Sequence, residues 1–232
     1  MTSAGLKALP PARDVPQVGA PSAMKVPSPS VRTLGNGLTV WAVRRPGIPL
    51  VQVRMVLPTS RARMAPSDRA RQRVLAPALL AGTTRSSRND LAARLQGMGA
   101  AAAAGADAED FSLSASALST NLVPLLEMLR EVLAESTFPA AEVATEKRRL
   151  QEELAMAASQ PRTIARLAVT SRVFGSHPYG DRLPSQDEIG RVTRGQLDAY
   201  LRRRIGPSGG HLVLVGDLST NRLLDAGEAA LH

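Results

Sequence analysis

The stretch Leu50-Val-Gln-Val-Arg-Met-Val-Leu57 alternates apolar and polar residues, and Phe111-Ser-Leu-Ser-Ala-Ser-Ala-Leu118 repeats the alternation. Successive side chains of a strand point to opposite faces, so this period of two predicts strands with one buried face. The segment 31–43 carries Asn36-Gly37 between β-branched residues, which favours two strands joined by a type I′ turn. His211-Leu-Val-Leu-Val-Gly-Asp217 predicts a further strand. The domain is therefore expected to contain a sheet.

Helical periodicity dominates the remainder of the chain. We expect helices at about 68–82, 89–99, 121–136, 140–158, 161–173 and 193–203, with the first kinked or split at Pro77. Strands and helices follow each other too irregularly for a doubly wound parallel sheet. The order favours an α+β fold with two layers, in which helices pack on one face of a mainly antiparallel sheet.

Composition sets the limits of this interpretation. The chain has 232 residues, of which 44% are hydrophobic and 21% charged, as in a globular protein with a sizeable core. Residues 1–30 hold six prolines and no apolar run, so they are predicted to be a disordered arm, followed by one domain over residues 31–232. The absence of cysteine excludes disulfides and thiolate-bound metals. With no apolar run of membrane-spanning length and no visible signal peptide, we expect a cytoplasmic location.

The net charge of +9 is concentrated in one part of the sequence. Between Arg44 and Arg88 there are ten arginines and a single acidic residue, Asp68. This stretch contains no aromatic residue that could stack on a base and no nucleic-acid-binding motif, so specific nucleic-acid binding is not expected. The alternatives are a solvated basic face and a basic wall that meets an acidic peptide or partner.

Seven short motifs occur in a fixed order between about Arg32 and Ser219. They are Leu34-Gly-Asn-Gly-Leu-Thr-Val40, Ala81-Gly-Thr83, Gly97-Met-Gly-Ala100, Phe138-Pro139, Glu146-Lys147 with Glu152-Glu153, His177-Pro-Tyr-Gly180 and Val215-Gly-Asp217. In this order and at these distances they resemble the insulinase/pitrilysin-type metallopeptidases and the subunits of mitochondrial processing peptidase. The resemblance implies a metallopeptidase half-domain of the N-terminal type.

The family's zinc signature, H-x-x-E-H, lies on the helix that ends just before the Gly-Thr pair. Its two histidines bind zinc from one helical face, the Glu between them activates water, and a distant Glu is the third ligand. Counted from Gly82, these positions hold Arg73, Ala76 and Pro77, and Glu153 takes the place of the third ligand. The resemblance therefore implies a non-catalytic member that holds neither metal nor cofactor.

Two further expectations concern the region around the altered motif. Arg73 and Glu153 are expected to form an ion pair in place of the metal, with Arg69 or Arg149 as substitutes for Arg73; the alternative for Glu153 is an exposed pair with Arg149. The segment Ala102, Ala103, Ala104 and Gly105 corresponds to the sheet edge on which the family's substrates add as a strand, or else is small-residue packing. His177 and His211 are expected to be structural.

The function that follows is a catalytically inactive, metallopeptidase-like domain. Its expected partner is a zinc-bearing homologous subunit of a peptide-processing heterodimer, or the second half of its own chain, since the sequence ends within an expected helix. Extended peptides are a further expected ligand. A structural scaffold, similar to the family's core subunits in a respiratory complex, and a stand-alone peptide-binding module are the alternatives.

Overall fold

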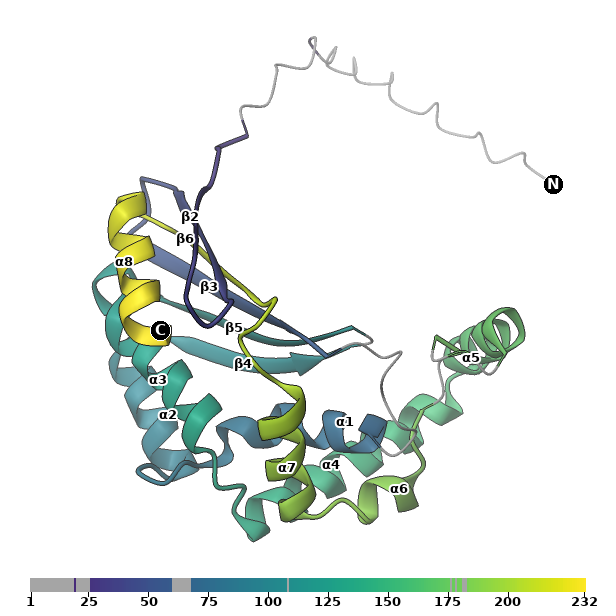
Figure 1. Cartoon of the computed structure of the whole chain (residues 1–232). Helices are drawn as coiled ribbons and strands as arrows, with labels where there is room; N and C mark the ends of the chain where they lie inside the picture. The colour runs from purple at the N-terminus through teal and green to yellow at the C-terminus, as the bar shows by residue number, and fades with distance from the viewer. Residues whose placement is uncertain are drawn as a thin grey trace, which may run out of the picture.

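A computed structural model describes residues 19, 26–59, 68–107, 109–175, 177, 179–180 and 183–232. The predicted arm, residues 1–30, lies almost entirely outside this range. Ser67, whose side chain the sequence suggests as the cap of a helix beginning at Asp68, also lies outside it. Figure 1 shows one sheet with helices gathered on one of its faces. None of the described helices is long and apolar enough to cross a lipid bilayer.

The sheet has six strands in the order β1-β2-β6-β3-β5-β4. They are β1 (Ser30–Thr33), β2 (Thr39–Arg44), β3 (Leu50–Pro58), β4 (Ala101–Ala106), β5 (Asp110–Leu118) and β6 (His211–Gly216). Every neighbouring pair is antiparallel except β2 and β6. The predicted mainly antiparallel sheet is confirmed.

Strand β3 has one buried and one exposed face, as its alternation of apolar and polar residues predicts. Val51, Val53 and Met55 are at most 2% exposed, whereas Gln52 and Arg54 on the other face are exposed. The inner face packs on the helical layer, which includes α1 (Asp68–Ala78), α2 (Arg88–Gly97), α3 (Leu122–Glu135) and α8 (Thr220–Leu231). The α+β fold with helices on one face is therefore confirmed.

The remaining helices extend this layer beyond the sheet. They are α4 (Ala140–Ser159), α5 (Pro161–Phe174), α6 (Gln186–Gly190) and α7 (Arg194–Arg204), with the short 3-10 turns η2 (Leu79–Ala81) and η3 (Ser119–Asn121). Helix α5 projects from the body (Figure 1) and has no buried residue. Its apolar side chains, among them Ile164, Val169 and Val173, are more than half exposed.

One local expectation, the type I′ turn, is wrong, and two elements go beyond what the periodicity predicts. The turn before β2 is not type I′, because that type requires positive φ at both central residues, whereas only Gly37 (φ 85°) has it. Instead, the Asn36 side chain accepts a hydrogen bond from the Leu38 N–H at 3.1 Å. The small-residue segment 101–106 forms a complete strand, and the short α6 was not anticipated.

Pro77 lies inside α1, and the helix neither splits nor stops there. Proline has no N–H, so the Arg73 carbonyl lacks its hydrogen-bond donor four residues later. The chain continues helical to Ala78, tightens into η2 and ends at Gly82, whose φ of 154° favours glycine. The expected kink thus takes the form of a change from α to 3-10 geometry.

Replacing Pro77 with Ala should raise the free energy of unfolding by about 1–3 kcal/mol. The substitution restores the hydrogen bond to the Arg73 carbonyl, and this outweighs the roughly 1 kcal/mol of chain stiffness that proline confers on the unfolded state. Urea denaturation followed by circular dichroism measures the change. Pro161→Ala is the control, because Pro161 stands at the start of α5, where proline is favourable, and its loss should give no gain. A destabilised P77A protein would contradict the account.

Candidate functional site

Helix α1 exposes a single stripe of residues. Arg69, Arg73 and Pro77 follow each other at four-residue spacing; Arg73 is exposed and the other two are partly so. The rest of the helix is largely buried, including Ala76 at 6% exposure. Residues 73 and 77 thus share one face, as the two histidines of an H-x-x-E-H motif would.

Buried hydrogen bonds fix α1 against the end of the sheet. The Gln72 amide donates to the Thr59 hydroxyl at 3.2 Å, and both residues are less than 8% exposed. Thr59 in turn donates its N–H (2.7 Å) and its hydroxyl (3.1 Å) to the Glu109 carbonyl in the turn between β4 and β5. The helix, the end of β3 and this turn are therefore held in one arrangement.

Among the described residues, strand β4 forms one edge of the sheet and pairs with β5 alone. The predicted edge residues, Ala102 to Gly105, lie in the middle of this strand. Their side chains are methyl groups or hydrogen, so little bulk covers the unpaired side of the backbone. Helix α1 packs against β4 from the helical layer and runs roughly along it in Figure 1. The edge strand and the helix that carries the exposed stripe are therefore neighbours.

The expected ion pair between Arg73 and Glu153 does not form. Arg73 makes no ion pair or side-chain hydrogen bond within the part of the chain that the structure describes. Glu153 instead accepts from Arg149, one turn earlier on α4, and is 53% exposed. Arg149 also contacts the buried Glu146 at 3.0 Å, and Glu146 is held by Arg88 of α2 at 2.8 Å. The charge of Glu153 is paired with an arginine of its own helix, so Glu153 does not need Arg73 as an ion-pair partner.

The residues of this region do not fit a zinc ion. A guanidinium is a permanent cation, and the side chains of alanine and proline carry no donor atom, so Glu153 alone could act as a ligand. Among the described residues, no group of three or more histidines and carboxylates is arranged to hold a metal.

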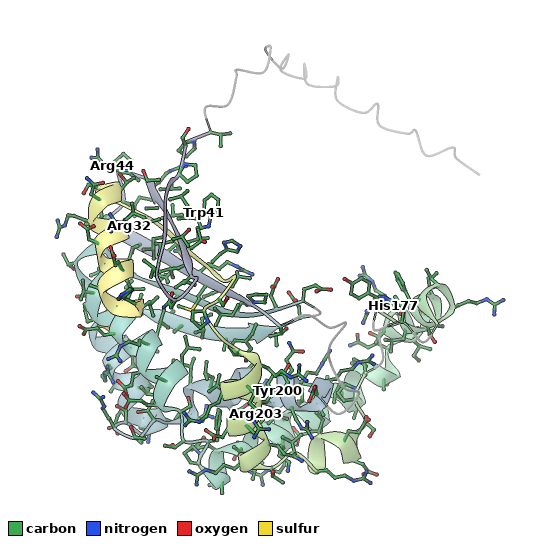
Figure 2. All side chains as sticks on the ribbon, viewed as in Figure 1. Arg32, Trp41, Arg44, His177, Tyr200 and Arg203 are labelled. Atoms are coloured by element: carbon green, nitrogen blue, oxygen red, sulfur yellow. The ribbon has the colours of Figure 1, made fainter. Side chains whose placement is uncertain are left out.

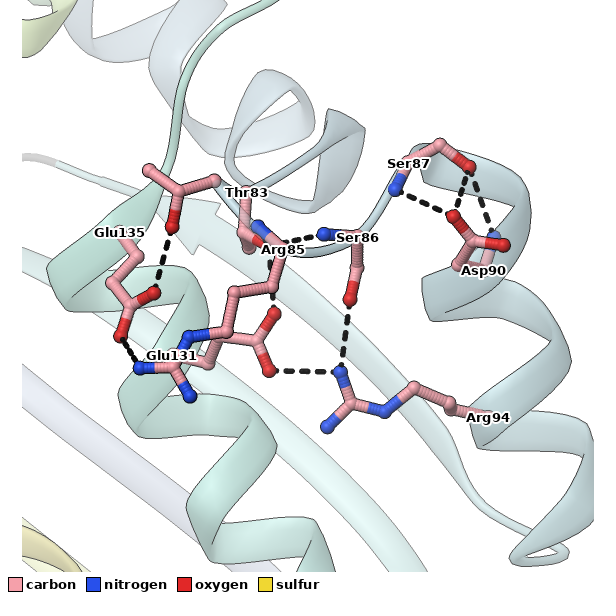
Figure 3. Close-up of polar contacts among 9 residues, drawn as sticks. Thr83, Arg85, Ser86, Ser87, Asp90, Arg94, Glu131 and Glu135 are labelled. Carbon is pink, nitrogen blue, oxygen red and sulfur yellow. Dashed lines mark hydrogen bonds and ion pairs between the residues drawn. The ribbon is translucent and has the colours of Figure 1, made fainter.

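A polar cluster missed by the sequence reasoning anchors the chain where α1 and η2 end (Figure 3). The Thr83 hydroxyl donates to the buried Glu131 of α3 at 2.6 Å, and Arg94 of α2 binds the same carboxylate at 2.8 Å. Thr83 also accepts from the Ser86 N–H, and Arg85 binds Glu135 at 2.7 Å. A glutamate within the apolar period of α3 was the signal for this cluster.

The charge of Glu131 is stabilised by its partners. Burial by itself would raise the pKa of this carboxyl, but the hydrogen bonds from Thr83 and Arg94 outweigh it, and the pKa lies below its usual range.

The opposite shift occurs at Asp110, at the turn beside β4. Burial, and to a smaller extent the nearby charges of Asp107 and Glu109, raise the pKa of its carboxyl. This end of the edge strand is thus acidic.

Glu131→Gln should lower the free energy of unfolding by about 1–2 kcal/mol at pH 7, because the variant leaves Arg94 without its charged partner. A carboxyl with a depressed pKa stabilises the fold above the ordinary pKa of Glu and loses this effect as the pH falls through its folded value. The difference between wild type and variant, measured by urea denaturation, should therefore shrink below about pH 4. Glu135→Gln is the control: its partner Arg85 is 66% exposed, so the loss should be under about 1 kcal/mol. Equal losses, or a difference independent of pH, would contradict this role.

Two histidines have the structural environments expected of them. His177 Nδ1 accepts from the Tyr179 N–H at 3.2 Å, and the two rings pack edge to face with centroids 4.8 Å apart. His211 Nδ1 accepts from the Trp41 indole at 3.1 Å. Figure 2 places Trp41 and His177 far apart, and the two pairs are not part of one site.

Comparison with known proteins agrees with this architecture. The model of the insulinase family (peptidase family M16) matches residues 75–186. The chain is insulinase-like. The matched segment covers the end of α1, the edge strand and α4. It includes Ala76, Pro77 and Glu153, three of the four residues that the sequence analysis aligned with the family's zinc site; Arg73 lies before it. No curated protein sequence matches the chain significantly.

Solved structures give the same fold at low sequence identity. The inactive M16 peptidase domain from Pseudomonas fluorescens superposes with a TM-score of 0.81 at 22% identity, over 88% of this chain and 50% of that one. A protease from Helicobacter pylori gives 0.80 at 16% identity, over 89% and 50%. The first half of the periplasmic protease PqqL from Escherichia coli gives 0.78 at 19% identity, over 88% and 45%. The chain thus spans half or less of the length of these relatives.

Proposed function

We propose that this insulinase-like domain binds extended peptides without cleaving them and acts as the non-catalytic part of a peptide-processing assembly. The observation that carries the proposal is the combination of α1 and β4. The open strand edge is accompanied by a helix with Arg73, Ala76 and Pro77 at the positions where the family has its metal ligands and base.

Peptide hydrolysis by the family's route needs a Lewis acid and a general base. Neither Arg73 nor Pro77 can bind zinc, and the methyl group of Ala76 cannot take a proton from water. Binding needs neither of these. An extended segment that adds to β4 satisfies the unpaired backbone groups of the edge strand, whatever its side chains.

A homologous partner half is the proposed second component. The structural relatives are about twice as long as this chain, and the Pseudomonas relative is described as an inactive domain. Helix α5 also presents apolar residues, among them Ile164, Val169 and Val173, that are more than half exposed. We propose a zinc-bearing homologue, or a second half of the same chain, as the source of catalysis.

The second candidate is a structural scaffold, which the exposed apolar face of α5 also favours. Co-purification distinguishes the two: a partner with an H-x-x-E-H motif supports the processing assembly, whereas a complex without any zinc-bearing homologue supports the scaffold. If no partner co-purifies and the isolated chain binds peptides, the result supports a stand-alone binding module.

Restoring the signature with R73H, A76E and P77H should create a zinc site. The two new histidines would share one face of α1 with Glu153 as the third ligand. Elemental analysis after dialysis should give about one zinc per chain for the triple variant and none for wild type. Wild-type protein that carries zinc and cleaves casein in a chelator-sensitive way would overturn the proposal.

The matched control adds E153Q to the triple variant. If Glu153 is the third ligand, zinc affinity should fall by more than the roughly 10–100-fold that changes in outer-shell partners cost. An unchanged affinity would show that Glu153 is not in the ligand position. Failure of the triple variant to bind zinc, with its circular dichroism unchanged, would show that α1 does not present these positions as assigned.

Strand addition to β4 can be tested on the ligand itself. A fluorescein-labelled decapeptide of Thr and Gln is N-methylated at one position at a time, and binding is followed by fluorescence anisotropy. Inward and outward N–H groups alternate along an added strand, so affinity should be lost at every second position and retained at the others. Uniform loss, or no loss, would contradict binding as a β-strand.

A further inference from the structure

Two arginines on the exposed stripe of α1 have no partner within the described structure. Arg69 and Arg73 form neither ion pairs nor side-chain hydrogen bonds with described residues, whereas Arg71, on the same helix, is bound to Asp68 at 2.7 Å. Like charges at i and i+4 repel one another on a helix surface. The stripe is therefore a site of uncompensated positive charge.

The helix that carries the stripe packs against the edge strand of the sheet. Helix α1 contacts β4, and β4 is the last strand of the sheet among the described residues. Glu153, the carboxylate expected to pair with Arg73, is bound by Arg149 instead. The acidic residues Asp107, Glu109 and Asp110 lie at one end of β4, but no described residue forms an ion pair with Arg69 or Arg73. A peptide that pairs with β4 would thus lie next to a helix that carries two arginines without an ion-pair partner in the described part of the chain.

The spacing of these arginines matches one particular sequence pattern. Residues four apart on a helix are separated by about 6 Å along its axis, at 1.5 Å per residue. Side chains on the same face of a strand are two residues apart, which is about 6.6 Å at 3.3 Å per residue. Adjacent residues of a strand point to opposite faces and cannot both reach the stripe.

We propose that the site selects extended peptides with two acidic residues at alternate positions, whose carboxylates bind Arg69 and Arg73. This inference rests on the proposed function, because it assumes strand addition to β4. It assigns to Arg73 a role different from that of a substitute metal. The guanidinium binds the side chain of the peptide instead of polarising its backbone.

The test compares labelled decapeptides of Thr and Gln that differ only at the centre. One has Glu-Thr-Glu, one has Thr-Glu-Glu with the same charge, one has Gln-Thr-Gln and one has Lys-Thr-Lys. Each arginine–carboxylate pair at an exposed site gives roughly twofold to fivefold in affinity. The Glu-Thr-Glu peptide should bind about tenfold more tightly than Gln-Thr-Gln and about threefold more tightly than Thr-Glu-Glu.

Charge reversal on the protein supplies the second arm. R69E/R73E should reverse the order of affinities, so that Lys-Thr-Lys binds best. If this charge reversal impairs folding, the neutral variant R69Q/R73Q replaces it and should bind the Glu-Thr-Glu and Gln-Thr-Gln peptides with equal affinity. R44E/R45E is the matched control with the same change of charge. Arg44 ends β2 and Arg45 follows it, and three strands separate β2 from β4 in the sheet, so this control should leave the order unchanged.

The outcomes distinguish failure of the acidic-peptide selection from failure of the proposed peptide-binding function. If Gln-Thr-Gln binds but Glu-Thr-Glu and Thr-Glu-Glu are equal, or if R69E/R73E changes nothing, peptide binding stands and the acidic pattern is wrong. If none of the peptides binds, both are wrong. If a thymidine oligonucleotide binds as tightly as Glu-Thr-Glu and is weakened equally by R69E/R73E, the stripe is a general polyanion surface and the selection for acidic peptides is overturned.

Discussion

Helix α1 packs against β4, α4, α6 and α7, and this burial decides which of its residues reach solvent. Val74, Leu75 and Ala78 are fully buried, so the helix cannot rotate without exposing them. The Gln72–Thr59 hydrogen bond and the Thr83–Glu131 cluster fix its two ends. As a result, residues 69, 73 and 77 must face outward, whichever amino acids occupy them. In the proposed assignment, the packing of α1 therefore fixes the direction of the positions that correspond to the family's metal ligands.

The sequence was sufficient for the elements whose periodicity is strong. Strand β3 and helices α3 and α4 extend within two residues of their predicted bounds, because one face of each is buried in the core. Strand β4 has no such period: alanine and glycine differ little between the two faces, so only the resemblance to a family placed it at the sheet edge. The prediction of a type I′ turn was wrong because Asn36 does not adopt the positive φ that this turn requires; its side chain accepts a hydrogen bond from the Leu38 N–H instead.

Side-chain pairing was the least predictable part of the site. The pair of Arg73 with Glu153 was inferred from two positions that converge in the family, but a nearer arginine on α4 satisfies Glu153 at a smaller loss of side-chain freedom. The Glu131 cluster links α2, α3 and the loop after η2. A glutamate within the apolar period of α3 indicates that a polar partner is needed, but the sequence does not say which distant residues supply it. The ten arginines of the segment 44–88 also separate in space. Arg44 and Arg45 lie at the end of β2, and Arg88 is bound to Glu146 across two helices.

In the proposed assignment, arginine at a metal position changes what the site can do as well as removing an activity. Zinc accepts an electron pair from a carbonyl oxygen and acidifies bound water, whereas a guanidinium stays protonated at any physiological pH and only donates hydrogen bonds. Such a group recognises carboxylates and leaves peptide bonds intact. If Arg73, Ala76 and Pro77 stand at the motif positions, as we propose, the proton acceptor and both helical ligands that cleavage requires are missing. The open backbone of β4 is unaffected, since strand pairing depends on no side chain. The same geometry is therefore suited to holding a peptide at the edge and choosing it by charge.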